Sequence, residues 1–239
     1  MEFLNRKSLL LLIVIILICL YLILTPKRLS NETKFLPKTM PPIEAKLPAP
    51  VYSSQTSIED ALKKRRSIRT YKNQAITLSQ VAQLLWAAQG ITSDNGFRTT
   101  PSAGALYPLE VYLVARDVND LSPGVYHYLP TKHALLKIKN GDISDQLTKA
   151  ALEQEAIKSG AANIVITAVF SRTTKKYGEK GKSFVFMEAG HAAQNIYLQT
   201  VSLNLGTVTI GAFDEPQVRQ ALNTPEDEIP LYILPIGGL

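Results

Sequence analysis

A turn of small residues runs directly into a strand at Pro101–Arg116, PSAGALYPLEVYLVAR, and this segment constrains the fold more than any other. Pro101 and Pro108 fix the backbone angle φ at both ends of the turn. Residues 102–105 are small, so a flat ligand or another backbone can approach closely. The alternating pattern over 109–116 predicts a strand. Alone, the segment fits two interpretations: a seat for a planar ring, or a tight loop packed on its own domain.

A second constraint is the apolar segment Ser8–Pro26, which carries no charged residue. As a helix it would span roughly 28 Å, close to the thickness of a bilayer core. A buried core helix, a cleaved signal peptide and a lipoprotein-type cleavage at Cys19 compete with a membrane anchor. No small-residue cleavage site follows Leu24, and bulky aliphatic residues precede Cys19. We therefore expect residues 1–26 to be an uncleaved, single-pass membrane anchor, whose orientation stays open because both flanks are basic.

Charge and composition exclude several classes of partner and site. The formal net charge is +6, and residues after 28 hold 22 basic and 19 acidic residues, a net charge of +3. This mild charge, without a basic stripe interleaved with aromatic residues, argues against nucleic acid. Cys19 is the only cysteine, so no intrachain disulfide or thiolate metal site is expected. His127, His133 and His191 lack the spacing of metal ligands, so we expect no metal site.

Five prolines in residues 27–56 predict an extended linker, followed by one domain over 57–239. Helices are expected to follow the cap residues Ser57, Thr77 and Asp214. The mixture of elements predicts an α+β fold in which helices wrap a central mixed, mainly antiparallel sheet. Further helices are expected at 143–158 and 182–203, and strands at 109–116, 125–128, 134–138, 163–170, 207–210 and 229–236.

Two polar clusters could carry chemistry. Arg65, Arg66 and Arg69 surround Ser67, and planar guanidiniums make bidentate bonds to phosphate. The alternative for them is a solvated basic face. Lys176-Tyr177 could share proton transfer if the pair is shielded from water, although KKYGEKGK is also the composition of a surface loop.

Two further segments could bind a ring or could only pack. The helix expected at Glu188–Leu198 has small residues that permit close helix–helix approach, while its Gln194 and Asn195 need partners if they are buried. A packed helix with satisfied amides is equally open. The segment Thr209–Asp214 ends a strand and begins a capped helix, where free amides can bond a ring heteroatom. A plain loop is the alternative.

Five of these segments, in this order, resemble the FMN-dependent nitroreductase superfamily, and within it the SagB-type, thiazole/oxazole-forming dehydrogenase branch. The resemblance covers residues 57–237, and it implies a nitroreductase-like fold with an FMN held at the interface of an intertwined homodimer. The segments are RRSIR (65–69), PSAGALYP (101–108), KYG (176–178), EAGHAAQNIYLQ (188–199) and IGAFD (210–214).

The resemblance also implies a role for individual residues. Lys176 and Tyr177 match a pair that the azoline-oxidising branch uses in proton abstraction. A cation at Arg69 would stabilise negative charge on the reduced ring. Many relatives supply a further basic residue to the phosphate from a longer C-terminal tail; here Arg65, Arg66 or the partner subunit is expected to replace it. The matching cofactor positions are Arg65, Arg66 and Ser67 (phosphate, ribityl chain and ring), Arg69 (pyrimidine end), Pro101, Ser102, Ala103, Gly104 and Leu106 (flavin lining), and Ile210, Gly211 and Ala212 (backbone near flavin N5).

These implications give one leading function and two alternatives. The leading function is a membrane-anchored FMN oxidoreductase that oxidises an azoline to an azole in a peptide or small-molecule substrate, by hydride transfer to flavin N5. The first alternative is NAD(P)H-dependent reduction of a nitro compound or a quinone. The second, of another class, is a flavin-binding module of a membrane assembly that has no turnover of its own.

Overall fold

The computed structural model describes residues 44–239. The expected membrane anchor at 1–26 and the first part of the expected linker lie outside these residues. Within the described range, no helix combines the length and the apolar character needed to cross a membrane.

Seven strands form one sheet in the order β1-β4-β3-β2-β5-β7-β6. Every neighbouring pair of these strands is antiparallel. The chain runs in opposite directions along adjacent strands, so the expectation of a mixed sheet is corrected. The central strands β2 and β5 pair along the whole length of β2. The strands are β1 (Glu44–Lys46), β2 (Leu109–Ala115), β3 (Gly124–Leu129), β4 (Ala134–Asn140), β5 (Ala162–Val169), β6 (Leu205–Thr207) and β7 (Glu228–Gly238).

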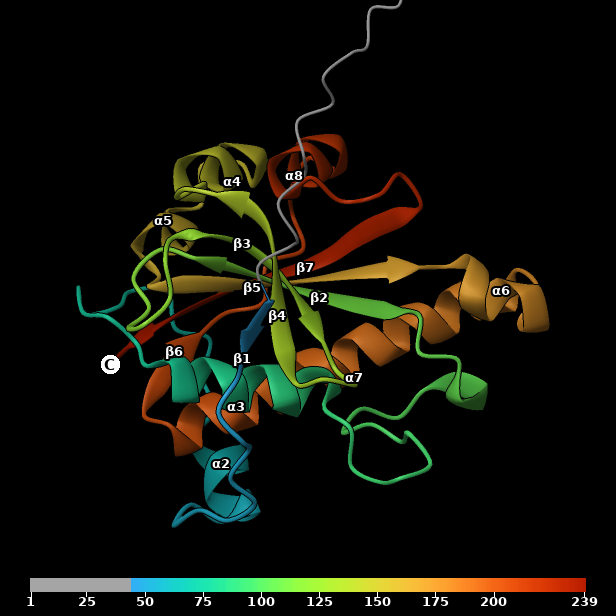
Figure 1. Cartoon of the computed structure of the whole chain (residues 1–239), viewed down its shortest axis with the longest axis horizontal. Coiled ribbons are helices and arrows are strands. Elements are labelled where there is room, and N and C mark those ends of the chain that lie inside the picture. Colours follow the sequence, from blue (N-terminus) through green and yellow to red (C-terminus); the bar gives the residue numbers. More distant parts are fainter. Residues whose placement is uncertain (1–43) are drawn as a thin grey trace, which may run out of the picture. The chain divides into compact units, whose positions relative to one another are not determined.

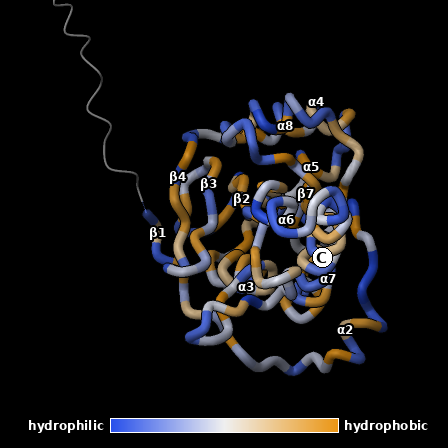
Figure 2. Tube along the Cα trace, turned by 90° about the vertical axis from the view of Figure 1, so that its right-hand side faces the viewer, coloured by the Kyte–Doolittle hydropathy of each residue, from blue (hydrophilic) through white to orange (hydrophobic). Residues whose placement is uncertain are grey.

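Helices cover both faces of this sheet, as the α+β prediction requires (Figure 1). α3 and α7 share a buried cluster with one face, through residues such as Leu85 and Ile196. α4, α5 and α8 share a second cluster with the other face, through residues such as Leu147 and Val218. Figure 2 shows the sheet between these two helical layers. The helices are α2 (Ile58–Lys64), α3 (Leu78–Gln89), α4 (Ser144–Ala150), α5 (Glu155–Ser159), α6 (Ser171–Tyr177), α7 (Lys180–Ser202) and α8 (Glu215–Leu222), with a 3-10 turn, η1 (Ala103–Ala105).

Three helix starts are confirmed by their caps. Ser57 Oγ and Asp214 Oδ1 each accept a hydrogen bond from the amide three residues on, at 3.1 and 2.9 Å. Thr77 and Gln80 form a reciprocal capping box at the start of α3. These side chains satisfy amides that the first turn of a helix leaves unpaired, so the sequence signal and the physical cause coincide.

Two helical segments differ from expectation. The single helix expected over 143–158 is divided into α4 and α5, because Leu152 and Glu153 adopt φ angles of 57° and 59°, which no α-helix accommodates. The polar loop expected after β5 is instead α6, so Lys176 and Tyr177 lie in the last turn of a helix that ends at Gly178. Both side chains are therefore projected by a regular backbone.

Part of the expected linker belongs to the folded domain. β1 pairs with β4 at the edge of the sheet, and Leu47 is buried in the core. The Gln83 side chain holds the backbone of Val51 through hydrogen bonds of 2.8 and 3.0 Å. Residues from Glu44 on are thus part of the domain, whereas the sequence placed its start at Ser57.

Candidate functional site

The segment 65–69 follows α2 and lies against the C-terminal part of α7. The Ser67 and Tyr197 hydroxyls lie 3.0 Å apart, and Tyr197 Oη also accepts a hydrogen bond from Thr209 N–H at 2.8 Å. The Ile68 N–H donates to the carbonyl of Thr207 in β6 at 2.8 Å. One tyrosine therefore fixes both the arginine segment and the chain that leaves β6. We call residues 65–69, Tyr197 and residues 207–212 the Tyr197 end of α7.

The Tyr197 end carries concentrated positive charge. The Arg65 guanidinium lies 5.2 Å from the centre of the Tyr197 ring. Burial raises the pKa of Tyr197, but its hydrogen bonds with Ser67 and Thr209, together with the Arg65 charge, lower it below its ordinary value. Within residues 44–239 the three arginines of segment 65–69 form no salt bridge. Such guanidiniums suit an anionic group, and phosphate above all.

The chain after β6 presents free backbone donors at the same end. Ile210 pairs with Ile233 through two backbone hydrogen bonds of 2.9 Å. Gly211 and Ala212 are exposed, and their N–H groups have no hydrogen-bond partner in the part of the chain that the structure describes. Two adjacent exposed N–H groups can donate to acceptor atoms of a ring. The loop alternative and the ring-binding alternative are both compatible with this geometry.

The turn at 101–108 lies beside the N-terminal half of α7. Gly104, Ala105 and Tyr107 have φ angles of 63°, 54° and 45°, a conformation that strains residues other than glycine. Ser102 holds the turn together: its Oγ accepts from Tyr107 N–H at 2.9 Å, and its carbonyl accepts from Ala105 N–H at 3.0 Å. The turn is therefore a fixed structure rather than an adaptable loop.

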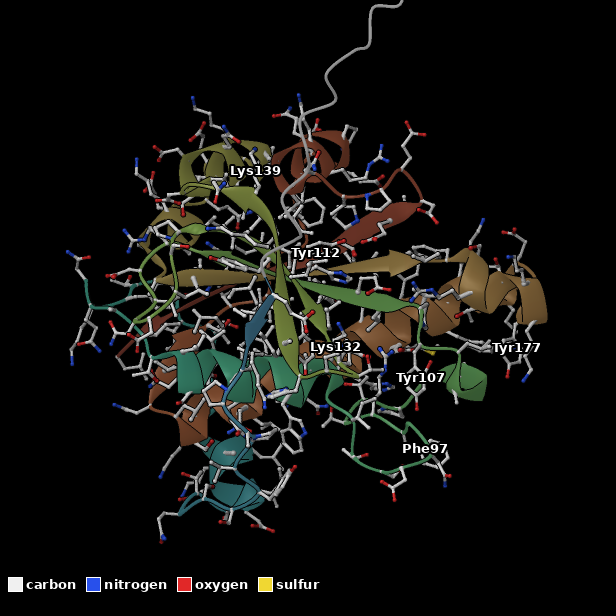
Figure 3. The ribbon with its side chains drawn as sticks, in the orientation of Figure 1. Phe97, Tyr107, Tyr112, Lys132, Lys139 and Tyr177 are labelled. Carbon is white, nitrogen blue, oxygen red and sulfur yellow. The ribbon has the colours of Figure 1, made fainter. Side chains whose placement is uncertain are left out.

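Gly104 brings this turn against the candidate proton-transfer pair. A Cβ on Gly104 would lie 2.8 Å from Tyr177 Oη and 2.9 Å from Lys176 Nζ, and its φ angle also favours glycine. The Tyr177 ring packs edge-on against Phe184 of α7, with ring centres 5.2 Å apart. Figure 3 shows Tyr107 and Tyr177 on this side of the molecule. The structure thus places the turn, Lys176 and Tyr177 side by side.

An ion cluster packs against the turn, and none of its members was a predicted site residue. Arg172 of α6 donates to the Tyr107 carbonyl at 3.0 Å and pairs with Glu110 of β2. Glu110 also bonds to His127 Nε2 at 2.8 Å. Burial raises the pKa of Glu110, but the bonds to His127 and Arg172 outweigh burial and lower it. The Arg98 guanidinium lies 4.5 Å from the centre of the Tyr107 ring. The one signal of this cluster in the sequence was Glu110, an acidic residue between two apolar positions of the expected strand.

A hollow of about 270 Å³ opens beside the turn, and Glu188 lies in its wall. Burial raises the pKa of Glu188 to about 7, against the opposing effects of the nearby Ser102 hydroxyl and the Arg98 charge. Asn195, a predicted partner-seeking amide of this helix, has a structural role, because it donates to the Ala87 carbonyl at 3.1 Å. The other wall residues are Pro101, Ser102, Ala103, Phe184, Met187 and His191. We call the turn at 101–108, Lys176, Tyr177 and this hollow the Glu188 end of α7.

The two ends do not converge within one chain. Phe184 and Tyr197 are thirteen positions apart on α7, a separation of about 20 Å along a helix. Figure 1 shows α2 and β6 near one end of α7 and α6 at the other. Residues 65–69 and 210–212 therefore form one group, and residues 101–106 with 176–177 form another.

The model of the nitroreductase family matches residues 62–238 of this chain. The protein named "Putative nitroreductase MJ1384" from Methanocaldococcus jannaschii is 43% identical over 183 residues, which cover 77% of this chain and 91% of that protein. The microcin B17-processing protein McbC of Escherichia coli is 26% identical over 147 residues, which cover 59% of this chain and 54% of McbC. The matched region therefore spans about half the length of McbC.

Two solved structures with the same nitroreductase description share the fold. The structure from Anabaena variabilis has a TM-score of 0.74 and 29% identity, covering 82% of this chain and 42% of that chain. The structure from Ralstonia eutropha has a TM-score of 0.72 and 27% identity, covering 84% of this chain and 95% of that chain. These similarities confirm the nitroreductase-like α+β fold that the resemblance implied.

Proposed function

The chain belongs to the nitroreductase family, and we propose that it is an FMN-dependent oxidoreductase whose active site combines the two ends of α7 from two copies of the chain. The observation that carries this proposal is the division of the candidate residues. Guanidiniums and free amides at the Tyr197 end suit a phosphate and ring heteroatoms. The small-residue turn and the Lys–Tyr pair at the Glu188 end suit a ring face and proton transfer.

A second copy of the chain is the partner that would complete the site. Large apolar side chains are more than half exposed on and around α2 and α7. Such a surface on a compact domain is typical of an interaction site. A homodimer that covers it could bring the Tyr197 end of one chain beside the Glu188 end of the other. These exposed residues are Tyr52, Ile58, Leu62, Phe186 and Met187.

The residues at the two ends fit FMN by the chemistry of their donors. Arg65, Arg66 and Ser67 would hold the phosphate and the ribityl chain, because they place charge and a hydroxyl on one strip where Arg65 is half-buried and the other two are exposed. Arg69 would lie at the pyrimidine end, and the N–H groups of residues 211–212 would face ring heteroatoms. Bound FMN would supply a two-electron acceptor for hydride transfer.

Lys176 and Tyr177 would handle the proton. Oxidation of an azoline removes a hydride from one ring carbon and a proton from the neighbouring Cα. An amine or phenolate within hydrogen-bond reach can take that proton. Lys176 is exposed and Tyr177 is half-buried in one chain, so both can meet a substrate bound over the turn at 101–106.

We favour a peptide or small-molecule azoline as substrate, supported by the similarity to McbC and by the Lys176-Tyr177-Gly178 segment. The 43% identity to MJ1384 favours the second candidate, an NAD(P)H-dependent nitro or quinone reductase. A flavin-binding module without turnover is the third. In each case the proposal includes a single-pass membrane anchor over residues 8–26, with its orientation unassigned.

The first experiment is the absorption spectrum of the purified full-length chain, with the released cofactor identified after denaturation. We expect a flavin spectrum and FMN in the supernatant. A protein that stays colourless after incubation with FMN contradicts the proposal. Rapid reduction of the bound flavin by NAD(P)H favours the reductase, whereas turnover of an azoline peptide favours the dehydrogenase. A bound flavin that neither NAD(P)H nor an azoline peptide reduces favours the flavin-binding module without turnover.

A further inference from the structure

Glu188 is an acidic residue of α7 that is buried in the wall of the hollow beside the turn at 101–108. It is 2% exposed, and its Oε1 has no hydrogen-bond partner among residues 44–239. An ionised carboxylate with an unpaired oxygen is costly to bury, while the neutral acid is tolerated more easily. The fold therefore favours a proton on this side chain.

Glu188 lines the same hollow as Pro101, Ser102 and Ala103 of the strained turn. A serine hydroxyl has one proton to donate and two lone pairs that accept. The Ser102 oxygen accepts from Tyr107 N–H at 2.9 Å and so holds the turn together. The nearby Ser102 hydroxyl lowers the pKa of Glu188, but burial of the acid outweighs this effect. An ionised Glu188 would have to draw water or a cation into this wall, and that would disturb the turn in which Tyr107 has a positive φ and Gly104 lies against Lys176.

We propose that Glu188 is a positioning residue that works in its neutral form: it holds the turn at 101–106 in the shape that binds FMN, and its ionisation weakens FMN binding. This inference rests on the proposed function, because that function assigns the turn to the FMN site. Glu188 acts through the wall of the hollow that it shares with the turn, and it takes no part in the chemical step.

Burial and charge act in the same direction once FMN is present. Burial already raises the pKa of Glu188 to about 7. The phosphate of FMN is anionic, and the ring gains negative charge on reduction, so both repel a nearby carboxylate. Binding of FMN and protonation of Glu188 therefore favour each other, and this coupling must be reciprocal.

The other titratable groups around Glu188 oppose this coupling or are separated from it. Arg98 faces Glu188 from the loop before the turn and favours the carboxylate. Arg98 is in turn influenced by Glu110 of β2 and Arg172 of α6, which form an ion pair with each other. His191 lines the same hollow from α7. Lys176 and Tyr177 of α6 lie across Gly104.

The test is Glu188→Gln in the full-length chain, because glutamine has the shape of the neutral acid and cannot ionise. FMN affinity is measured by quenching of FMN fluorescence over a pH series. We expect equal affinities for the two proteins at about pH 6, and about tenfold tighter binding by the variant at about pH 8.5. The ratio of the two affinities cancels the titration of the FMN phosphate and of all other groups.

Glu179→Gln is the matched control. Glu179 precedes α7, its side chain is 87% exposed, and it pairs with Lys182. Removing this charge should leave the wild-type pH profile of FMN affinity unchanged. The inference is overturned if Glu188→Gln also keeps the wild-type profile, or if it weakens FMN binding equally at every pH, as a loss of packing alone would.

A second measurement separates this inference from the proposed function. The Glu188 carboxyl can be followed by carbon-13 NMR in the protein without FMN, with its signal assigned by its loss in Glu188→Gln. We expect titration near pH 7, and titration near the ordinary value of 4.5 overturns the inference even if FMN binds. If the wild type binds no FMN at any pH, the proposed function fails, and the titration still decides whether Glu188 is neutral in the fold.

Discussion

The two ends of α7 rely on different physical effects, although one helix carries both. The Tyr197 end offers guanidiniums that are exposed or half-buried, together with free amides, and these attract an anion from water. The Glu188 end has a turn with three positive φ angles, a buried acid and an ion cluster beneath it. The first end can bind charge without being rigid, whereas the second stores strain to hold a shape. A change that leaves the shape of the turn intact at the Glu188 end should therefore not alter anion binding at the Tyr197 end, and loss of the arginines should not alter the turn.

The largest effect is expected from Lys176→Ala combined with Tyr177→Phe at the Glu188 end. Oxidation of an azoline peptide should fall by about 10²–10⁴-fold, which is the usual contribution of general acid–base catalysis. FMN affinity should stay close to wild type, because the phosphate is held at the Tyr197 end. Steady-state kinetics and FMN titration measure the two properties separately.

Lys175→Ala is the control for this pair, since Lys175 is an exposed neighbour on α6. It should retain wild-type turnover. If the double variant of Lys176 and Tyr177 loses FMN but keeps its turnover at saturating FMN, the assignment of proton transfer to the Glu188 end is wrong. If the double variant turns over both the azoline peptide and NAD(P)H at the wild-type rates, the proposal of an azoline dehydrogenase loses its support.

The next effect is expected from Arg65→Ala combined with Arg66→Ala at the Tyr197 end. FMN affinity should fall by about 100-fold, since hydrogen bonds to charged groups contribute about 1.5–3 kcal/mol each. The remaining affinity should depend less on salt, because screening acts on charge attraction. Lys132→Ala removes an exposed cation that pairs with Glu44 elsewhere, and it should leave affinity unchanged. A rate at saturating FMN that drops as steeply as the affinity would show that the ends are not independent.

The third effect is a pH dependence of folding stability that arises at the Glu188 end. Folding raises the pKa of Glu188 from 4.5 to about 7, so the folded chain binds this proton more tightly than the unfolded chain. This stabilisation is fully present below about pH 4.5 and is lost as the pH rises through about 7. Relative to Glu188→Gln, the wild type should lose about 2–3 kcal/mol of unfolding free energy over that window, measured by urea denaturation without FMN.

Other acids do not obscure this comparison. The lowered pKa of Glu110 contributes stability at higher pH that is lost as the pH falls through its folded value, and it does so in both proteins. The difference between wild type and variant therefore isolates Glu188. If the unfolding free energies of wild type and Glu188→Gln change in parallel with pH, the Glu188 carboxyl is solvated, and its buried environment does not persist in solution.

Local signals predicted much of the fold because their causes are local. Ser57, Thr77 and Asp214 cap helices through amides three residues away, and the alternation over 109–116 follows one strand. The break between α4 and α5 had no such signal, because Leu152 and Glu153 are not the residues that positive φ favours. β1 was also missed, because the strand with which it pairs, β4, lies far along the chain.

The motifs also named the candidate residues without arranging them. Residues 65–69 and 101–108 are close in sequence, yet they lie at opposite ends of α7, because α3 returns the chain between them. Glu188 is a candidate because it is buried beside Ser102 in the wall of the hollow. Arg172 is one because it pairs with Glu110 and donates to the Tyr107 carbonyl. Burial and pairing of this kind are properties of the packed fold, so no pattern within one segment could predict them.

The smallest effect is expected from Tyr197→Phe, which tests the structural link at the Tyr197 end. The change removes the hydroxyl that contacts Ser67 and accepts from Thr209 N–H, while the ring can remain beneath Arg65. The unfolding free energy should fall by about 1 kcal/mol, with turnover at saturating FMN unchanged. Tyr52→Phe is the control, because Tyr52 is 79% exposed, and its stability should match wild type. If Tyr197→Phe instead lowers turnover, α7 transmits changes between its ends, and the site would have to be treated as one cooperative unit.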